Sequence, residues 1–318
     1  MDGSRYGILR VGRFAVFALV AGVLVLLAGG CSGSEAGASG DGLRVTATTT
    51  MVTDLARRVG GERVEVTGLM GPGVDPHLYK ASQGDVEALL GADVVFYNGL
   101  FLEGQMAEIL EKADQQVPTV AVTRDVPEGE LLESVSCEGQ ADPHVWFDAT
   151  LWRTTVDPVV EEFSRLDPEG AEAYERRGEA YKEEIDQLHA FVGEEISSIP
   201  KDRRVLVTAH DAFRYFGREY GMEVRGLQGI STEAEAGAGD VRELADYLAE
   251  NEIPAIFVES SVPRRNVEAV QAASRDRGWD LEIGGTLYSD AGGDAGTDAA
   301  TYDGMFRANA RTITEALR

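Results

Sequence analysis

Two kinds of hydrophobic pattern alternate along the chain from residue 43 onward. Short runs rich in β-branched residues, such as LRVTATT at 43–49, are typical of strands, and the nearly continuous run DVVFYNG at 93–99 is typical of a strand buried on both faces. Between them stand segments of helical spacing, such as DLARRVGG at 54–61, which ends in glycine. Alternation of this kind predicts parallel sheets with helices packed around them.

The same alternation continues to the end of the chain. Further strands are predicted in RVEVTGLM at 63–70, TVAVT at 119–123, RRVLVTAH at 203–210, EVRGLQG at 223–229, AIFVES at 255–260 and LEIGGTLY at 281–288. Helices are predicted near QGDVEALLGA at 83–92 and in the final segment at 302–318. The whole pattern has the character of an α/β protein.

One segment departs from this alternation of short strands and helices. Residues 168–200 are rich in Glu, Ala, Lys and Arg, carry aromatic and aliphatic residues at helical spacing, and are bounded by Pro168 and Pro200. They predict one helix of around thirty residues, far longer than the mean of about 11–12. His189 is expected to be a half-exposed residue of this helix. The simplest architecture is therefore two α/β lobes, at 43–165 and 201–318, joined by a linking helix at 166–200.

The first thirty residues predict a cleaved export signal. Three arginines precede the uncharged run FAVFALVAGVLVLLAGG, which ends in small residues just before Cys31. LLAGGCSG resembles a bacterial lipobox, in which the cysteine is acylated, although Ala28 and Gly29 depart from its commonest form. Residues 31–42 then read as a flexible Gly/Ser-rich tether. The alternative is an uncleaved membrane-spanning anchor, because the run approaches the ~17-residue lower limit for a span.

Charge and cysteine content narrow the class of protein. The formal net charge of −26 argues against a nucleic-acid binder, because such a surface repels a phosphate backbone. Cys137 is the only cysteine besides Cys31, so no disulfide framework supports the fold if Cys31 is lipidated. Cys137 itself is expected to be a free thiol in a loop, with zinc ligation as the alternative.

Three of the four histidines, His77, His144 and His210, lie at positions typical of ligand-binding residues. His77 follows a predicted strand through a Gly-Pro-Gly loop, His210 ends a predicted strand, and Asp290 lies just past another. Ligands of open α/β sheets gather outside the carboxyl ends of strands. His77 and His144 also share the tripeptide Asp-Pro-His, in which proline stiffens the loop that presents the imidazole.

The aspartates of these two tripeptides have a candidate role. Metal-ligating histidines usually donate the second ring N–H to a carboxylate, a carbonyl or water. Asp75 and Asp142 are candidates for such acceptors. A proline turn with a packed histidine is the alternative for either motif alone, but the two motifs together favour a binding site.

Several stretches resemble the metal-binding lipoproteins of manganese and zinc ABC importers. They are VTATTTMVTDLARRVGGERVEVTGLMGPGVDPHLY, DVVFYNGLFLEG, DPHVWFD, TAHDAFRYFGREYG, GLQGISTEAEAGAGD, IFVESSVP and LYSDAGGDAGTDAATYDGMFRANARTI, which together span residues 43–318. The resemblance implies two lobes joined by a rigid helix, with one divalent transition metal between them. It implies His77 and His144 as ligands from the first lobe, and His210 and Asp290 as ligands from the second.

The resemblance also implies partners and a location. The expected partners are an ABC permease with its ATPase subunit, and the expected state is a monomer held outside the membrane by lipidated Cys31. The metal stays open: three imidazoles and a carboxylate suit Zn²⁺, whereas LYSDAGGDAGT resembles members tied to manganese, and no His-rich insertion precedes His144. Glu259 is expected either to support a ligand from behind or to make a structural hydrogen bond.

Other functions remain as alternatives. A zinc-dependent hydrolase is one, although four ligands would close the site and no motif nominates a general base. A surface adhesion protein with a structural metal is another. Asp294 and Asp298 are expected to be solvated loop charges, and Trp146 and Phe147 to support His144 by packing.

Overall fold

A four-stranded parallel sheet organises the first lobe. The computed structural model describes residues 42–134 and 139–318; the predicted signal at 1–30, the predicted lipidation site Cys31, the predicted tether up to residue 41 and Cys137 lie outside the described residues. The strand order is β2-β1-β3-β4. The bounds are β1 Leu43–Ala47, β2 Val64–Gly68, β3 Val94–Tyr97 and β4 Thr119–Ala121.

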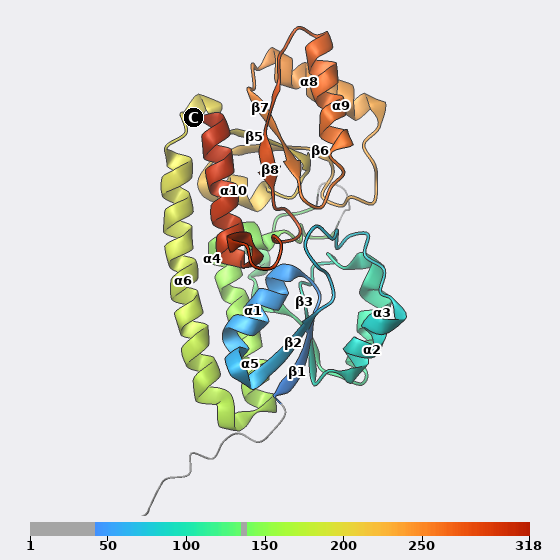
Figure 1. Cartoon of the computed structure of the whole chain (residues 1–318), viewed down its shortest axis with the longest axis vertical. Coiled ribbons are helices and arrows are strands. Elements are labelled where there is room, and N and C mark those ends of the chain that lie inside the picture. The colour runs from blue at the N-terminus through green and yellow to red at the C-terminus, as the bar shows by residue number, and fades with distance from the viewer. Residues whose placement is uncertain (1–41, 135–138) are drawn as a thin grey trace, which may run out of the picture. The chain divides into compact units, whose positions relative to one another are not determined.

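Helices cover both faces of this sheet. They are α1 Thr50–Gly60 on one side, and α2 Gln83–Gly91 with α3 Ala107–Asp114 on the other (Figure 1). Alternate residues of β3 serve the two sides, since Val94 and Phe96 belong to one hydrophobic cluster and Val95 to another. The continuous apolar run of this strand is therefore explained by burial on both faces.

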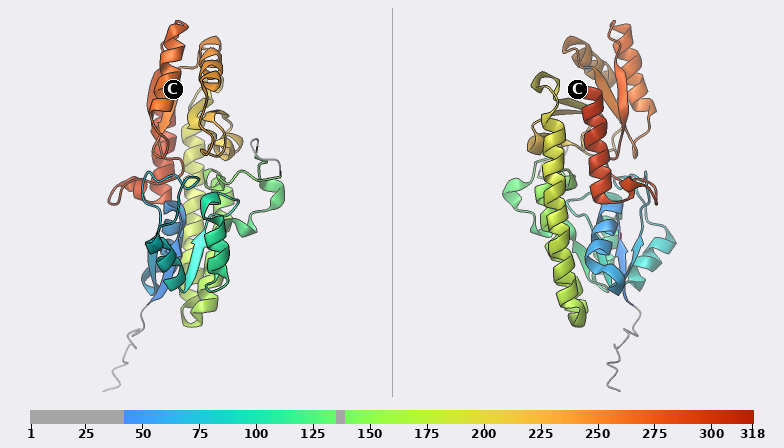
Figure 2. Two further views of the ribbon diagram at one scale, coloured as in Figure 1. Left: turned by 90° about the vertical axis from the view of Figure 1, so that its right-hand side faces the viewer. Right: turned by 60° about the vertical axis from the view of Figure 1, so that its left-hand side comes forward.

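The long helix predicted between the lobes is present. A 3-10 turn at Pro168–Gly170 leads into α6, Ala171–Ser197, which has 27 residues. It packs against α5 Val156–Leu166, and a Cβ on Gly178 would lie only 2.6 Å from Cγ2 of Val160. The final helix α10, Tyr302–Leu317, lies alongside α6 (Figures 1 and 2). The helices α6 and α10 are thus far apart in the sequence but packed against each other in the fold.

The second lobe contains two pairs of parallel strands. β5 Val205–His210 pairs with β6 Glu223–Gln228, and β7 Ala255–Glu259 pairs with β8 Glu282–Leu287. β5 lies next to β7, so the two pairs form one layer. Besides α10, the helices of this lobe include α7 Arg214–Tyr220, α8 Ala238–Glu250 and α9 Arg265–Asp276. The expected α/β class, with parallel strands and a long helix, is confirmed.

The two lobes meet where a short 3-10 turn of the first lobe contacts segments that follow the strands of the second. Trp146 of the first lobe donates its indole N–H to the carbonyl of Ser289 at 3.0 Å, and Tyr302 donates its hydroxyl to the carbonyl of Trp146 at 2.7 Å. Phe147 and Phe213 stack with ring centroids 4.2 Å apart. Trp146 and Phe147 are fully buried. The short turn after His144, Val145–Phe147, is thus part of the contact between the lobes.

Candidate metal centre

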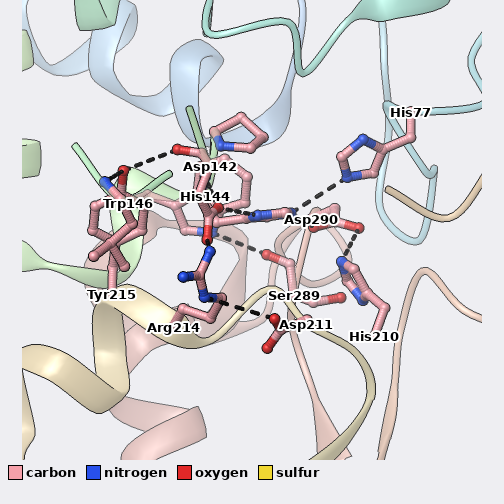
Figure 3. A network of polar contacts seen from close by, with 12 residues as sticks. His77, Asp142, His144, Trp146, His210, Asp211, Arg214, Tyr215, Ser289 and Asp290 are labelled. Carbon is pink, nitrogen blue, oxygen red and sulfur yellow. Dashed lines mark hydrogen bonds and ion pairs between the residues drawn. The ribbon is translucent and has the colours of Figure 1, made fainter. Parts of the chain in front are cut away.

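The fold brings together three imidazoles and one carboxylate from distant parts of the chain. They belong to His77, His144, His210 and Asp290, all buried, and one ligand atom from each lies within 4.8 Å of the others (Figure 3). His77 lies on the loop after β2, His210 is the last residue of β5, and Asp290 lies on the loop after β8. These are the four residues nominated by sequence, two from each side of the lobe contact.

The distances within this group suit a small ion. Nε2 of His77 lies 3.3 Å from Nε2 of His144, and the two oxygens of Asp290 lie 3.4 Å from Nε2 of His144 and 3.3 Å from Nε2 of His210. Two ligands bound tetrahedrally at ~2.0–2.1 Å, as zinc binds nitrogen and oxygen, stand about 3.3–3.4 Å apart. The group therefore has the spacing of ligands to one cation.

Two atoms of the group are buried without a hydrogen-bond partner among the described residues. They are Nε2 of His210 and Oδ1 of Asp290. Leaving a buried polar atom unpaired costs ~1–3 kcal/mol, and more for a charged group. A bound cation would satisfy both atoms, so the donor set fits a metal.

Two of the imidazoles contact carboxylates through Nδ1, the ring nitrogen that faces away from the centre of the group. Oδ1 of Asp142 lies 2.7 Å from Nδ1 of His144, and Oε2 of Glu259 lies 2.5 Å from Nδ1 of His210. Each contact fixes Nδ1 as the protonated nitrogen and leaves Nε2 facing the centre. Glu259 also accepts the backbone N–H of His210 at 2.8 Å.

The third imidazole is arranged differently. Oδ1 of Asp75 accepts the backbone N–H of His77 at 2.9 Å, and Oδ2 accepts the hydroxyl of Thr232 at 2.6 Å. The carboxylate is therefore engaged by a backbone group and by the other lobe rather than by the ring of His77. Asp142 likewise accepts the backbone N–H of His144, at 3.1 Å, so the two Asp-Pro-His tripeptides differ only in the further contacts of their aspartates.

The charges within the group shape its protonation. Burial lowers the pKa of His77 to about 3. Burial would also lower the pKa of His144, but Asp142 and then Asp290 outweigh it and raise this pKa to about 9. Asp290 and Glu259 likewise raise the pKa of His210 well above its usual value, against the effect of burial. Burial opposes ionisation of Asp290, yet the neighbouring imidazoles hold its pKa well below the usual range.

The remaining candidates lie outside the group. His189 is on α6, with Nδ1 3.3 Å from the hydroxyl of Tyr220. Asp294 and Asp298 are exposed, as expected for loop charges. Sequence reasoning did not single out Thr232 or Ser261, which contact Asp75 and Asp290. The serine pair directly after the strand AIFVE was the available signal for Ser261.

A small cavity adjoins the group on the side of His77. Its volume is about 90 Å³, and its walls include Leu100 and Pro143 from the first lobe and Ile230 and Ser231 from the second. It reaches only one of the four clustered side chains. The group is therefore closely enclosed by protein.

A family model matches almost the whole described chain. It is described as ZnuA, the periplasmic component A of a zinc-uptake complex, and it matches residues 45–316. All four clustered residues fall within the matched range.

Individual relatives match over nearly their full lengths. The manganese-binding lipoprotein MntA of Bacillus subtilis is 48% identical over 99% of this chain and 100% of its own length. The zinc-binding protein TroA of Treponema pallidum is 46% identical over 96% of this chain and 98% of its own. The solved structure of the periplasmic zinc-binding protein TroA superposes with a TM-score of 0.85, at 47% identity, over 87% of this chain and 99% of that one.

Proposed function

We propose that this chain, which belongs to the ZnuA family of periplasmic zinc-uptake components, captures one divalent transition metal ion and delivers it to the permease of an ABC importer. The metal is manganese or zinc, held as cargo by His77, His144, His210 and Asp290. The observation that carries the proposal is the convergence of these four buried groups from both lobes, two of whose ligand atoms, Nε2 of His210 and Oδ1 of Asp290, have no hydrogen-bond partner among the described residues.

The division into lobes gives this capture a mechanism. We assign residues 43–165 to the first lobe, 166–200 to the linking helix and 201–318 to the second lobe. His77 and His144 then belong to one lobe, and His210 and Asp290 to the other. A metal that binds all four favours the state in which the lobes are together, because only that state offers every ligand. The long helix with α10 beside it limits the movement to small displacements.

The donor set allows both metals. Three imidazoles and one carboxylate form a tetrahedral set that suits zinc, and zinc binds such sites more tightly than manganese. Relatives of nearly equal similarity nevertheless have different metals in their names, manganese at 48% identity and zinc at 46%. Overall similarity therefore does not choose the metal, and a direct competition between the two ions is the decisive measurement.

The proposed role is that of a carrier rather than a hydrolase. Catalytic zinc sites keep an open position and a nearby general base. Here four ligand groups converge, and both oxygens of Glu259 are engaged by the ring and the backbone of His210. Hydrolysis that depends on Glu259 would restore the hydrolase alternative, and a metal-free protein that fails to fold would favour a structural metal.

The location follows from the same proposal. We expect Cys31 to be lipidated and to anchor a monomer to the outer face of the cell membrane, where it meets an ABC permease coupled to an ATPase subunit. Several relatives, including MntA of Bacillus subtilis and PsaA of Streptococcus mitis, are named as lipoproteins. Within residues 42–134 and 139–318, none of the helices has the length and hydrophobicity to cross a membrane.

The test combines elemental analysis of the purified protein with a competitive titration against Mn²⁺ and Zn²⁺. We expect one equivalent of metal, and we expect His144→Ala to weaken binding at least about a hundredfold, beyond the ~10–100-fold typical of an outer partner. His189→Ala is the matched control, since His189 lies on α6 outside the group. Unchanged affinity in His144→Ala, with normal folding, would refute the assignment.

A further inference from the structure

The carboxylate of Asp290 presents its two oxygens in unequal surroundings. Oδ2 lies 3.2 Å from the hydroxyl of Ser261, whereas Oδ1 has no hydrogen-bond partner among the described residues. Both oxygens also face imidazole nitrogens, Oδ1 that of His144 and Oδ2 that of His210. Asp290 can thus offer a metal one oxygen or two, and Ser261 contacts only one of them.

A second hydroxyl orients Ser261. The hydroxyl oxygens of Ser261 and Ser289 lie 2.8 Å apart. A serine hydroxyl has a single hydrogen to donate. If Ser289 donates to Ser261, the hydrogen of Ser261 is free to point at Oδ2 of Asp290, which as a carboxylate can only accept. Ser289 is fully buried, so this short chain of hydroxyls is shielded from competing water on that side.

We propose that Ser261 determines how many oxygens Asp290 gives to the metal, and thereby sets the relative affinity of this protein for zinc and manganese. With its hydroxyl on Oδ2, Ser261 leaves Oδ1 as the stronger ligand oxygen, so that the centre offers three nitrogens and one oxygen. The inference rests on the proposed function and deepens it, because it names a residue that chooses between the two candidate metals.

The coordination preferences of the two ions give the inference its direction. Zinc is most often four-coordinate and tetrahedral, while manganese favours higher coordination with oxygen ligands. A hydrogen bond from Ser261 draws electron density from Oδ2 and holds the carboxylate in place, which disfavours a fifth donor. Removing the hydroxyl frees Oδ2 to bind alongside Oδ1, a change that benefits manganese more than zinc.

The experiment is a competitive titration of purified Ser261→Ala and native protein with Mn²⁺ and Zn²⁺. We expect the ratio of the manganese Kd to the zinc Kd to fall on the order of tenfold in the variant, the lower end of the range for outer partners of metal ligands. Co²⁺ serves as a spectroscopic probe, because four-coordinate Co²⁺ absorbs visible light more strongly than five-coordinate Co²⁺. We expect the absorption per bound Co²⁺ to fall in Ser261→Ala.

The neighbouring serine provides the matched control. Ser260 precedes Ser261 on the same turn, and its buried hydroxyl has no hydrogen-bond partner among the described residues. Ser260→Ala removes the same atom one residue away and should leave both the ratio and the Co²⁺ spectrum unchanged. Ser261→Thr keeps a hydroxyl and should retain the native ratio.

Different outcomes would refute the proposed function and the role of Ser261. Native protein that binds neither metal refutes the proposed function itself. Native protein that binds metal, together with a Ser261→Ala variant whose two affinities are unchanged or fall by the same factor, refutes the role of Ser261 alone. A fall in the ratio without a change in the Co²⁺ spectrum would also refute it, because the mechanism requires a change in coordination.

Discussion

Thr232 donates its hydroxyl hydrogen to Asp75 at 2.6 Å, although 157 residues separate the two. The other oxygen of Asp75 accepts the backbone N–H of His77, so the loop that presents this imidazole is bonded to the segment between β6 and α8 of the second lobe. Thr232 is only 6% exposed, which shields the bond from water. Gln105 and Glu233 form a further hydrogen bond between the lobes next to it.

The bond between Thr232 and Asp75 should slow the release of metal. Thr232→Val keeps the shape of the side chain and removes the donor, which costs about 1.5 kcal/mol, the lower value for a hydrogen bond to a charged group. We therefore expect release about tenfold faster, as measured by stopped-flow transfer of bound Zn²⁺ to an excess of chelator. Thr232→Ser retains the hydroxyl and should behave like the native protein. Equal release rates for the valine variant and the native chain would contradict this role.

Much of the fold could be predicted from local patterns because each pattern has a local cause. The run VLVTAH predicted a strand that ends at His210, and β5 ends at that residue. Pro168 and Pro200 correctly bracketed a long helix, with its first turn in 3-10 form. The four candidate ligands could be nominated because each lies in a stiff loop or at a strand end, and the structure does bring them together. Their role as ligands stays a prediction.

The hydrogen-bond partners of these residues could not be predicted in the same way. Asp75 and Asp142 occupy the same place in identical tripeptides, yet Asp142 contacts the ring of His144 and Asp75 contacts Thr232. The second lobe brings a different group to each carboxylate, the hydroxyl of Thr232 to Asp75 at 2.6 Å and the guanidinium of Arg214 to Asp142 at 3.4 Å. No spacing in the sequence reports such a neighbour, since the contact depends on how two separately patterned lobes meet.

Metal binding should become tighter as the pH rises beyond neutrality. The pKa of His144 is raised to about 9 and that of His210 well above its usual value. At neutral pH each of these rings therefore carries a second proton, besides the one on Nδ1, in the metal-free closed state. A metal must displace these protons, and higher pH removes the competition. The raised pKa values also mean that the metal-free protein gains stability below pH 6.5 and loses this gain as the pH rises toward 9.

The tighter binding increases the thermal shift caused by metal across the range from pH 6.5 to 9. The measurement is thermal unfolding with and without Mn²⁺ at several pH values, supported by calorimetry in buffers of different ionisation enthalpy to detect proton release. His77, whose pKa is lowered to about 3, contributes no proton in this range. A thermal shift that is constant with pH would contradict the prediction.

Close packing of the long helix should make Gly178 intolerant of a side chain. A Cβ at Gly178 would lie 2.6 Å from Cγ2 of Val160 on α5, whereas a Cβ at Gly193 on the same helix would have no neighbour within 4 Å in the part of the chain that the structure describes. Alanine favours a helix over glycine by up to about 1 kcal/mol, but overpacking costs ~1–3 kcal/mol. We expect Gly178→Ala to be at least about 1 kcal/mol less stable than Gly193→Ala in chemical unfolding. Equal free energies of unfolding for the two variants would show that α5 accommodates the added methyl group without loss of stability.

Glu259 should support metal binding through His210. Its two oxygens accept Nδ1 at 2.5 Å and the backbone N–H at 2.8 Å, which together fix the ring with Nε2 toward the centre. Glu259→Gln keeps the size of the side chain but replaces one acceptor oxygen with an amide donor that faces an N–H group. The ring loses its negatively charged partner in either orientation of the amide, and one of the two N–H groups of His210 then faces a donor instead of an acceptor.

We expect Glu259→Gln to weaken metal affinity by roughly 10–100-fold, as for other partners of ligating histidines. The measurement is a competitive titration with Zn²⁺, accompanied by thermal unfolding of the metal-free variant to show that the fold persists. Glu268→Gln is the control, because Glu268 is an exposed acid bonded to Arg264 at 2.9 Å away from the group. If Glu259→Gln binds metal as tightly as the native protein, the orientation of His210 must come from packing within β5 instead of from this carboxylate.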